Sequence, residues 1–195
     1  REAQVPFVMM GFRVPNYSSE DSYALDILES VLSHGKSSRL YQNLVYEQKN
    51  SLSVGAEYSL IQTDPGLFYF YSLVNPTAKV EAVEEALHRE IHRLQNEPPS
   101  EQELQRAKNQ VEASRVFEQD SNFRHAMLLG QLESVGAGWR RLDQYIERIR
   151  AVTAKDIQRV AKQYLTQDNR TIGILIPLPP KPPESSPATA QEGKS

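Results

Sequence analysis

Apolar positions along the chain first follow the two-residue spacing of strands and later the spacing of helices. Residues 5–14 form a mainly apolar run that is bounded by Pro6 and Pro15 and is short enough for a buried strand. Residues 52–60 and 67–74 predict the two arms of a hairpin, joined by the turn Thr63-Asp64-Pro65-Gly66. The second arm is aromatic on both faces, so we expect it inside a sheet with both sides covered. In the first arm one face is expected to carry Leu52, Val54, Ala56, Tyr58 and Leu60.

Helical spacing appears twice before the hairpin and dominates after residue 75. A first helix is expected to begin at Ser18 or Ser19 and to end at Gly35. A second begins at Ser37 or Ser38, and its apolar side consists of Leu40, Tyr41, Leu44 and Val45. After the hairpin, Pro98-Pro99 ends one helix, and Ser100 with Glu103 forms a capping box for the next. Further helices are predicted at about 122–135, at 140–152 and from the Thr153–Asp156 cap to Leu165, before a last strand at 171–176.

This order of elements predicts an α+β fold, in which the last strand returns to a sheet formed by strands far back in the sequence. The folded domain is expected to span residues 1–177. Residues 178–195 are rich in proline, serine and glutamate, so we expect a disordered tail with polyproline character. Such a tail is most simply a frayed terminus, and a proline-recognising partner is the alternative.

Composition narrows the functional classes. The chain has 195 residues, a formal net charge of -3 and 39% hydrophobic residues, which suits one globular domain with a real core. Acidic and basic residues are interleaved along the chain, which argues against a nucleic-acid-binding surface. The absence of cysteine excludes disulfides and thiolate zinc sites, and it fits either the cytosol or the periplasm. No secretion signal or membrane-spanning segment is visible in these residues.

The strongest candidate for a metal site in the sequence is His88-Arg89-Glu90-Ile91-His92, because histidines four residues apart share one helix face. Zinc motifs of this kind are His-x-x-Glu-His or His-Glu-x-x-His, and Glu90 stands at neither glutamate position. It is expected on roughly the opposite side of the helix from the histidines. We therefore interpret the segment as a solvated helix face and predict no metal ligand in this chain.

The sequence contains no other catalytic motif. It has no Gly-x-Ser-x-Gly elbow, no cysteine nucleophile and no phosphate-binding glycine loop. The carboxylate pairs Glu84-Glu85 and Glu101/Glu103 fall on helix surfaces or caps, and His34 and His125 have no partner acid close in sequence. We predict no catalytic residue here.

Three segments together resemble the M16 metallopeptidases, the family of insulin-degrading enzyme, pitrilysin and the mitochondrial processing peptidases. They are Gly11-Phe12-Arg13-Val14-Pro15, the run from Ser37 to Gln48, and Asp168 to Pro177. The chain is most similar to the second, non-zinc-bearing domain of an M16 half-molecule. The resemblance implies a mixed, mostly antiparallel sheet with helices on one face. It also implies zinc-dependent peptide hydrolysis by a parent protein whose zinc lies in a first domain outside this fragment.

The resemblance also supplies a test. The closing half of many M16 enzymes contributes an arginine and a tyrosine that reach the substrate, and these positions correspond to Val45 and Leu52 here. With both missing, no substrate-binding residue is predicted. Tyr46 and Tyr58 are poor substitutes, because a shift of one residue changes the direction of a side chain.

Two roles within the family remain. The chain is either the wall of the peptide chamber beside a zinc-bearing domain of the same parent, which we favour, or part of a scaffold subunit without peptidase activity. A hypothesis from a different functional class is that the chain is a purely structural or partner-binding module, whose exposed helices dock a second M16-like half. Trp139, which follows Gly136-Ala137-Gly138, would then be an interface anchor, although the simpler interpretation is that it fills a gap at the edge of the core. Similar bacterial relatives lead us to expect the periplasm or cell envelope.

Overall fold

The computed structural model describes residues 4–63, 65–119 and 121–178. Its sheet consists of β1 (Phe7–Val14), β2 (Ser51–Tyr58), β3 (Gly66–Val74) and β4 (Arg170–Leu175). The strand order is β2-β3-β1-β4, and all neighbours are antiparallel. The hairpin and the returning last strand are therefore confirmed. Asp64 of the predicted turn lies outside the described residues, and so does the predicted tail except for residue 178.

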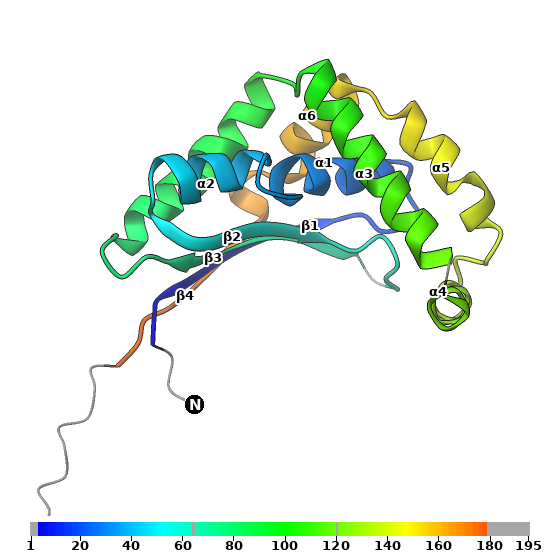
Figure 1. The fold of residues 1–195 in the computed structure, drawn as a ribbon, viewed down its shortest axis with the longest axis horizontal. Coiled ribbons are helices and arrows are strands. Elements are labelled where there is room, and N and C mark those ends of the chain that lie inside the picture. The colour runs from blue at the N-terminus through cyan, green and yellow to red at the C-terminus, as the bar shows by residue number, and fades with distance from the viewer. Residues whose placement is uncertain (1–3, 64, 120, 179–195) are drawn as a thin grey trace, which may run out of the picture.

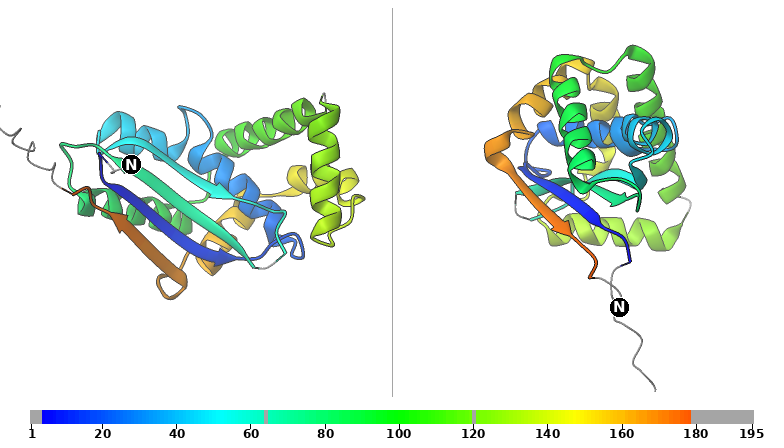
Figure 2. Two further views of the ribbon diagram at one scale, coloured as in Figure 1. Left: turned by 90° about the horizontal axis from the view of Figure 1, so that it is seen from below. Right: turned by 90° about the vertical axis from the view of Figure 1, so that its left-hand side faces the viewer.

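The helices cover one face of this sheet (Figures 1 and 2). They are α1 (Asp21–Ser33), α2 (Val80–Asn96), α3 (Glu101–Gln119), α4 (Asn122–Ser134), α5 (Arg141–Ala151) and α6 (Ala154–Tyr164). Buried side chains of β1 and β3 meet the helices, and the rings of Phe12 and Phe70 pack edge to face with centroids 6.0 Å apart. The α+β class and the helices on one face are confirmed. No helix within the described ranges is both long and apolar enough to span a bilayer.

Two helix starts are capped as the sequence predicts. The Ser100 N–H and hydroxyl each lie 2.9 Å from the Glu103 carboxylate, and Ser100 Oγ accepts from the Glu103 N–H. Thr153 and Asp156 form the same reciprocal pair at the start of α6. These caps satisfy backbone donors that a helix start leaves unpaired.

Two predictions about the hairpin are wrong. β3 lies inside the sheet, but only the side that carries Phe68, Phe70, Ser72 and Val74 is buried, because no described helix covers the other side. Leu52 does not share a face with Val54 and Ala56, because the pairing of β2 with β3 shifts by one residue between Ser51 and Ser53. This β-bulge leaves Leu52 49% exposed.

The predicted helix after Ser37 exists, but its main part, η1 (Tyr41–Glu47), is a π-helix. The Gln48 N–H donates to the Asn43 carbonyl, five residues back, at 2.9 Å. Leu40 and Leu44 are fully buried, while Tyr41 and Val45 are only half-buried. The fully buried side of this helix is therefore narrower than the four-residue apolar side that the sequence predicts. π-Helical turns often occur at functional sites.

Candidate functional site: the open face of the sheet

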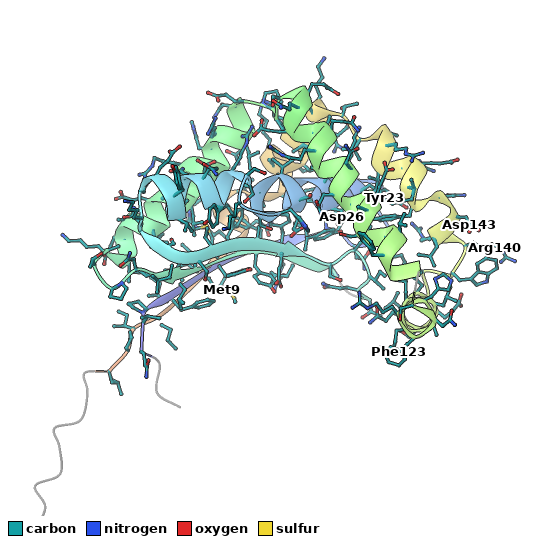
Figure 3. The ribbon with its side chains drawn as sticks, in the orientation of Figure 1. Met9, Tyr23, Asp26, Phe123, Arg140 and Asp143 are labelled. Atoms are coloured by element: carbon teal, nitrogen blue, oxygen red, sulfur yellow. The ribbon has the colours of Figure 1, made fainter. Side chains whose placement is uncertain are left out.

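The side of the sheet away from the helices carries no described element, and we call it the open face (Figure 1). Residues opposite each other on neighbouring strands point to the same side, so the strand registers place its residues in rows. Met9, which lies in the central row, points away from the helices in Figure 3. In the order β2, β3, β1, β4, the rows are Ser53–Leu73–Phe7–Leu175, Gly55–Tyr71–Met9–Gly173 and Glu57–Tyr69–Gly11–Thr171.

Two glycines let large side chains lie flat on this face. A Cβ atom at Gly55 would lie 2.6 Å from the ring carbon Cζ and the hydroxyl of Tyr71, so the Tyr71 ring covers β2 at that point. A Cβ atom at Gly11 would lie 3.3 Å from a methyl group of Leu67. Both glycines are buried although they belong to the open face. The result is a smooth, largely apolar surface, on which the rings of Tyr69 and Tyr71 lie 6.4 Å apart.

Polar groups lie along one edge of the aromatic pair. The Tyr69 hydroxyl donates to the Glu57 carboxylate, and this bond raises the pKa of Tyr69 to about 12. Arg13 is exposed on the same face, opposite Leu67. The open face therefore combines aromatic surface with one carboxylate and one guanidinium, a combination suited to contacts with peptide groups and apolar side chains.

A polar network that starts at one buried carboxylate supports η1, and it was not predicted from the sequence. Glu90 of α2 is only 3% exposed, and the Asn43 amide of η1 donates to its carboxylate. The Gln48 amide donates to Asn43, and the Asn50 amide donates to Gln48 at 2.9 Å. This series of bonds fixes the path from η1 into β2. A signal was available, since Glu90 lies three residues after Leu87 and four before Leu94 on the buried stripe of α2.

His88 and His92 both contact polar groups of neighbouring residues. A nitrogen of the His88 ring lies 2.9 Å from Nη1 of Arg170, so a lone pair that could bind a metal accepts a hydrogen bond from a guanidinium instead. Burial, followed by the Arg170 charge, lowers the pKa of His88. The Asn96 side chain donates to the His92 carbonyl and also lies 3.2 Å from the His92 ring nitrogens. Glu90 lies on the buried side of the same helix, and no cluster of three potential ligands occurs among the described residues. This donor set does not fit zinc.

His34 and His125 stay apart from these groups. His34 ends α1, with its backbone N–H bonded to the Ser30 carbonyl, and His125 lies in the first turn of α4. Glu84 contacts His88 at 3.6 Å, while Glu103 is held by Arg39 through two bonds of 2.7 and 3.1 Å. In the described structure Glu84 thus lies beside His88, and Glu103 lines a cavity together with His34.

Comparison with known proteins assigns the family. The model of the Peptidase M16 inactive domain matches residues 1–111, more than half of the chain. The chain belongs to this family. Zinc protease PqqE of Helicobacter pylori is 27% identical to this M16 domain over 171 residues, which are 88% of this chain and 38% of that protein. The alpha subunit of the mitochondrial-processing peptidase of Neurospora crassa is 28% identical over 80% of this chain and 29% of its own length.

Solved structures agree with this assignment. The inactive peptidase domain from Bordetella parapertussis is 28% identical, covers 91% of this chain and 96% of its own, and gives a TM-score of 0.83. A protease from H. pylori is 25% identical and gives a TM-score of 0.82, with 88% of this M16 domain and 41% of that chain covered. The domain spans about two fifths of the length of the bacterial zinc proteases that it matches.

The structure also locates the two positions where the family resemblance expects an arginine and a tyrosine. Val45 is half-buried in η1, and Leu52 is the bulged residue at the start of β2. Tyr58 lies at the other end of β2, where its hydroxyl donates to the Pro15 carbonyl at 2.7 Å. Tyr46 is 68% exposed on η1, but it occupies a neighbouring position on the helix. That no substrate-binding residue replaces the missing pair stays a prediction.

Trp139 lies in the connection between α4 and α5 and is 45% exposed, so it is not part of the buried core. Its role as an interface anchor or as a filler at the edge of the core stays a prediction. Its ring lies 4.8 Å from the Arg140 guanidinium, within cation–π distance. Phe123 and Met127, one helical turn apart on α4, are also at least half exposed, and Phe123 points away from the body of the domain (Figure 3). This end of the helical layer therefore presents several large apolar side chains.

Proposed function

We propose that this M16 domain is the non-catalytic second domain of a zinc-dependent peptidase and that its open face forms part of the wall of a peptide-binding chamber. The observation that carries the proposal is the uncovered, apolar and aromatic open face. A monomeric domain rarely leaves such a surface to water without a binding function. The zinc-protease names of its relatives support the same parent activity.

An extended peptide suits this surface. The rows on the open face repeat at the spacing of a strand, so alternate side chains of a peptide can meet successive rows. Tyr69, Tyr71 and Met9 can make apolar contacts with side chains of different shapes. Glu57 can accept hydrogen bonds from peptide groups, and Arg13 can donate to them. We therefore expect the open face to bind peptides of many different sequences.

Zinc is expected in a domain outside these residues, where the metal would polarise the scissile carbonyl and acidify a bound water. The residues of this chain would bind and orient the peptide and keep water from its far side. They supply neither the metal nor the general base.

A photo-crosslinking experiment tests the chamber-wall role. In the full-length protein that carries this domain, benzoylphenylalanine replaces Met9 at the centre of the open face or Gln105, an exposed residue of α3, as the matched control. A peptide substrate is expected to crosslink at position 9 and not at position 105. Equal yields at the two positions, or none at position 9, would contradict the proposal.

A scaffold subunit is the second candidate. Its supporting observations are the absence of arginine and tyrosine at Val45 and Leu52 and the apolar side chains around α4 with Trp139. A second M16-like half would be the partner. Sequencing the coding frame upstream of Arg1 separates the candidates. An intact His-x-x-Glu-His with one zinc per full-length protein favours the peptidase, and a degraded motif without bound zinc favours the scaffold.

We also propose the periplasm or cell envelope as the location, on the basis of the bacterial relatives. Fractionation of the source cells, with a cytosolic and a periplasmic marker, tests it. Recovery with the cytosolic marker would refute this part.

A further inference from the structure

A cavity of about 490 Å³ lies on the helix side of the sheet, where α2, the C-terminal end of α6 and the start of β4 meet. β4 is an edge strand, as the order of the sheet shows, and α2 and α6 pack against each other above it (Figure 2). Six of its lining residues have polar side chains that matter here: His88, His92, Gln95, Lys162, Thr166 and Arg170.

The cationic groups of this cavity lack acidic partners. Arg170 directs Nη1 at the His88 ring, and in the described ranges this is the only side-chain nitrogen of Arg170 with a hydrogen bond. No carboxylate of those ranges lies within 4 Å of Arg170 or Lys162. The Glu84 carboxylate contacts His88, a lining residue, at 3.6 Å. Several N–H donors of a guanidinium and an ammonium group therefore remain available.

The walls of the cavity are fixed. The Gln95 amide donates to the Ala161 and Leu165 carbonyls at 3.2 and 3.0 Å, and the Gln158 amide donates back to the Gln95 carbonyl at 3.1 Å. These bonds hold α2 to the end of α6. Because these walls are already in place, they need not be ordered when a ligand arrives.

The geometry points to a binding site for an oxyanion, that is, a carboxylate or phosphate group, held by Arg170 and Lys162 with Thr166 and His92 beside them. A guanidinium with free donors matches the paired oxygens of such groups, and an ammonium group adds a point charge. The volume suits a group larger than a single ion, since small-molecule pockets begin at about 300 Å³. Both the terminal carboxylate of a peptide and inorganic phosphate meet this description. The site is separate from the open face and does not depend on the proposed function.

Titration of the 195-residue chain tests the site, with the imidazole NMR signals of His88 as the reporter. Inorganic phosphate is added at constant ionic strength set with chloride, so that general screening stays unchanged. The wild-type signals are expected to shift and saturate. Arg170→Gln and Lys162→Gln are expected to weaken binding at least tenfold and severalfold, respectively, and Arg170→Lys to weaken it less than Arg170→Gln. The control Lys155→Gln, at an exposed position of the same helix outside the cavity, is expected to bind as the wild type does.

A second titration identifies the source of the oxyanion. It compares an acetylated tripeptide that ends in a free carboxylate with the same tripeptide as its amide. Binding of the free acid alone assigns peptide ends as the ligand, and binding of phosphate alone assigns a free oxyanion. Thermal melts show whether each variant is folded. The site is refuted if neither probe gives a saturable shift in the wild type, or if Lys155→Gln weakens binding as much as a folded Arg170→Gln variant.

Discussion

Glu90 of α2 accepts a hydrogen bond from Asn43 of η1, and this contact joins the two helices through a carboxylate that is almost fully buried. The second carboxylate oxygen of Glu90 is buried without a partner in the described structure. A π-helix next to the hairpin is thus held by a polar contact at its centre, and the chain leaves η1 for β2 in one fixed direction.

Removal of this carboxylate should destabilise the domain. Glu90→Ala leaves the partly buried Asn43 amide without its acceptor and opens a small cavity, so we expect a loss of about 1–3 kcal/mol in the free energy of unfolding. Glu90→Gln keeps an acceptor oxygen and should lose less. Urea unfolding followed by circular dichroism measures both. Glu85→Ala on the exposed side of the same helix is the control, and an equal loss there would contradict a special role for Glu90.

Glu29 should make stability depend on pH near neutrality. Burial raises its pKa from 4.5 to about 7, with nearby Asp26 and Glu57 adding to the shift against the Ser33 hydrogen bond. A raised folded-state pKa gives a contribution that is fully present below pH 4.5 and is lost as pH rises through about 7. Glu29→Gln should therefore match the wild type near pH 4.5 and be more stable near pH 8, by on the order of 2–3 kcal/mol.

Urea midpoints measured from pH 4.5 to 8.5 check this expectation. The exposed Glu133→Gln on α4 serves as the comparison. A difference between Glu29→Gln and the wild type that stays constant over this range would contradict the raised pKa of Glu29.

The Arg39–Glu103 pair should control how the free energy of unfolding falls at acidic pH, which we call the acid limb. Two hydrogen bonds from Arg39, followed by the Ser100 contacts, lower the pKa of Glu103 to about 2. Its contribution is present above pH 4.5 and is lost as pH falls toward 2. Arg39→Gln should cost roughly 1.5–3 kcal/mol at pH 7, the usual range for hydrogen bonds to charged groups.

The same variant should flatten the loss of stability between pH 4.5 and 2, which acid titration of the circular dichroism signal measures. Arg93→Gln, whose partner Glu97 lies 3.4 Å away on the surface, should change little. An unchanged acid limb in Arg39→Gln would refute this assignment.

Gly55 and Tyr71 should be energetically coupled. A methyl group at position 55 meets the Tyr71 ring at 2.6 Å, so Gly55→Ala should displace that ring from the open face. In a Tyr71→Ala background the same glycine change should cost less, because nothing is then displaced. A double-mutant cycle by urea unfolding measures the coupling, expected at about 0.5–1 kcal/mol. Strictly additive effects would show that the ring does not lie over Gly55 in solution.

Much of this fold could be predicted because its local signals agree with one another. The Ser100–Glu103 and Thr153–Asp156 caps fix helix starts, and the spacing of apolar residues fixes which helix sides are buried. Whether one or both faces of β3 are buried could not be predicted in this way. Aromatic residues on both faces of a strand indicate either two buried faces or one buried face and one uncovered face, and Tyr69 and Tyr71 belong to the latter case.

Leu52 and Glu90 show two other limits. A β-bulge changes the facing of one residue without changing the sequence pattern around it, so alternation alone places Leu52 on the wrong side. A single acid at the margin of an apolar stripe resembles the many solvated acids of helix surfaces. Only the partner from a distant segment, Asn43, explains why Glu90 is buried.

The bulge at Leu52 has a consequence for how such domains diverge. Leu52 is half exposed, and Val45 is not part of the fully buried core, so neither side chain is a main determinant of packing. Substitution at these two positions would therefore cost the fold little, whichever residues are gained or lost. The side chains at this site can then change while the scaffold keeps its stability, which makes the surface chemistry of the site and the stability of the fold separately heritable.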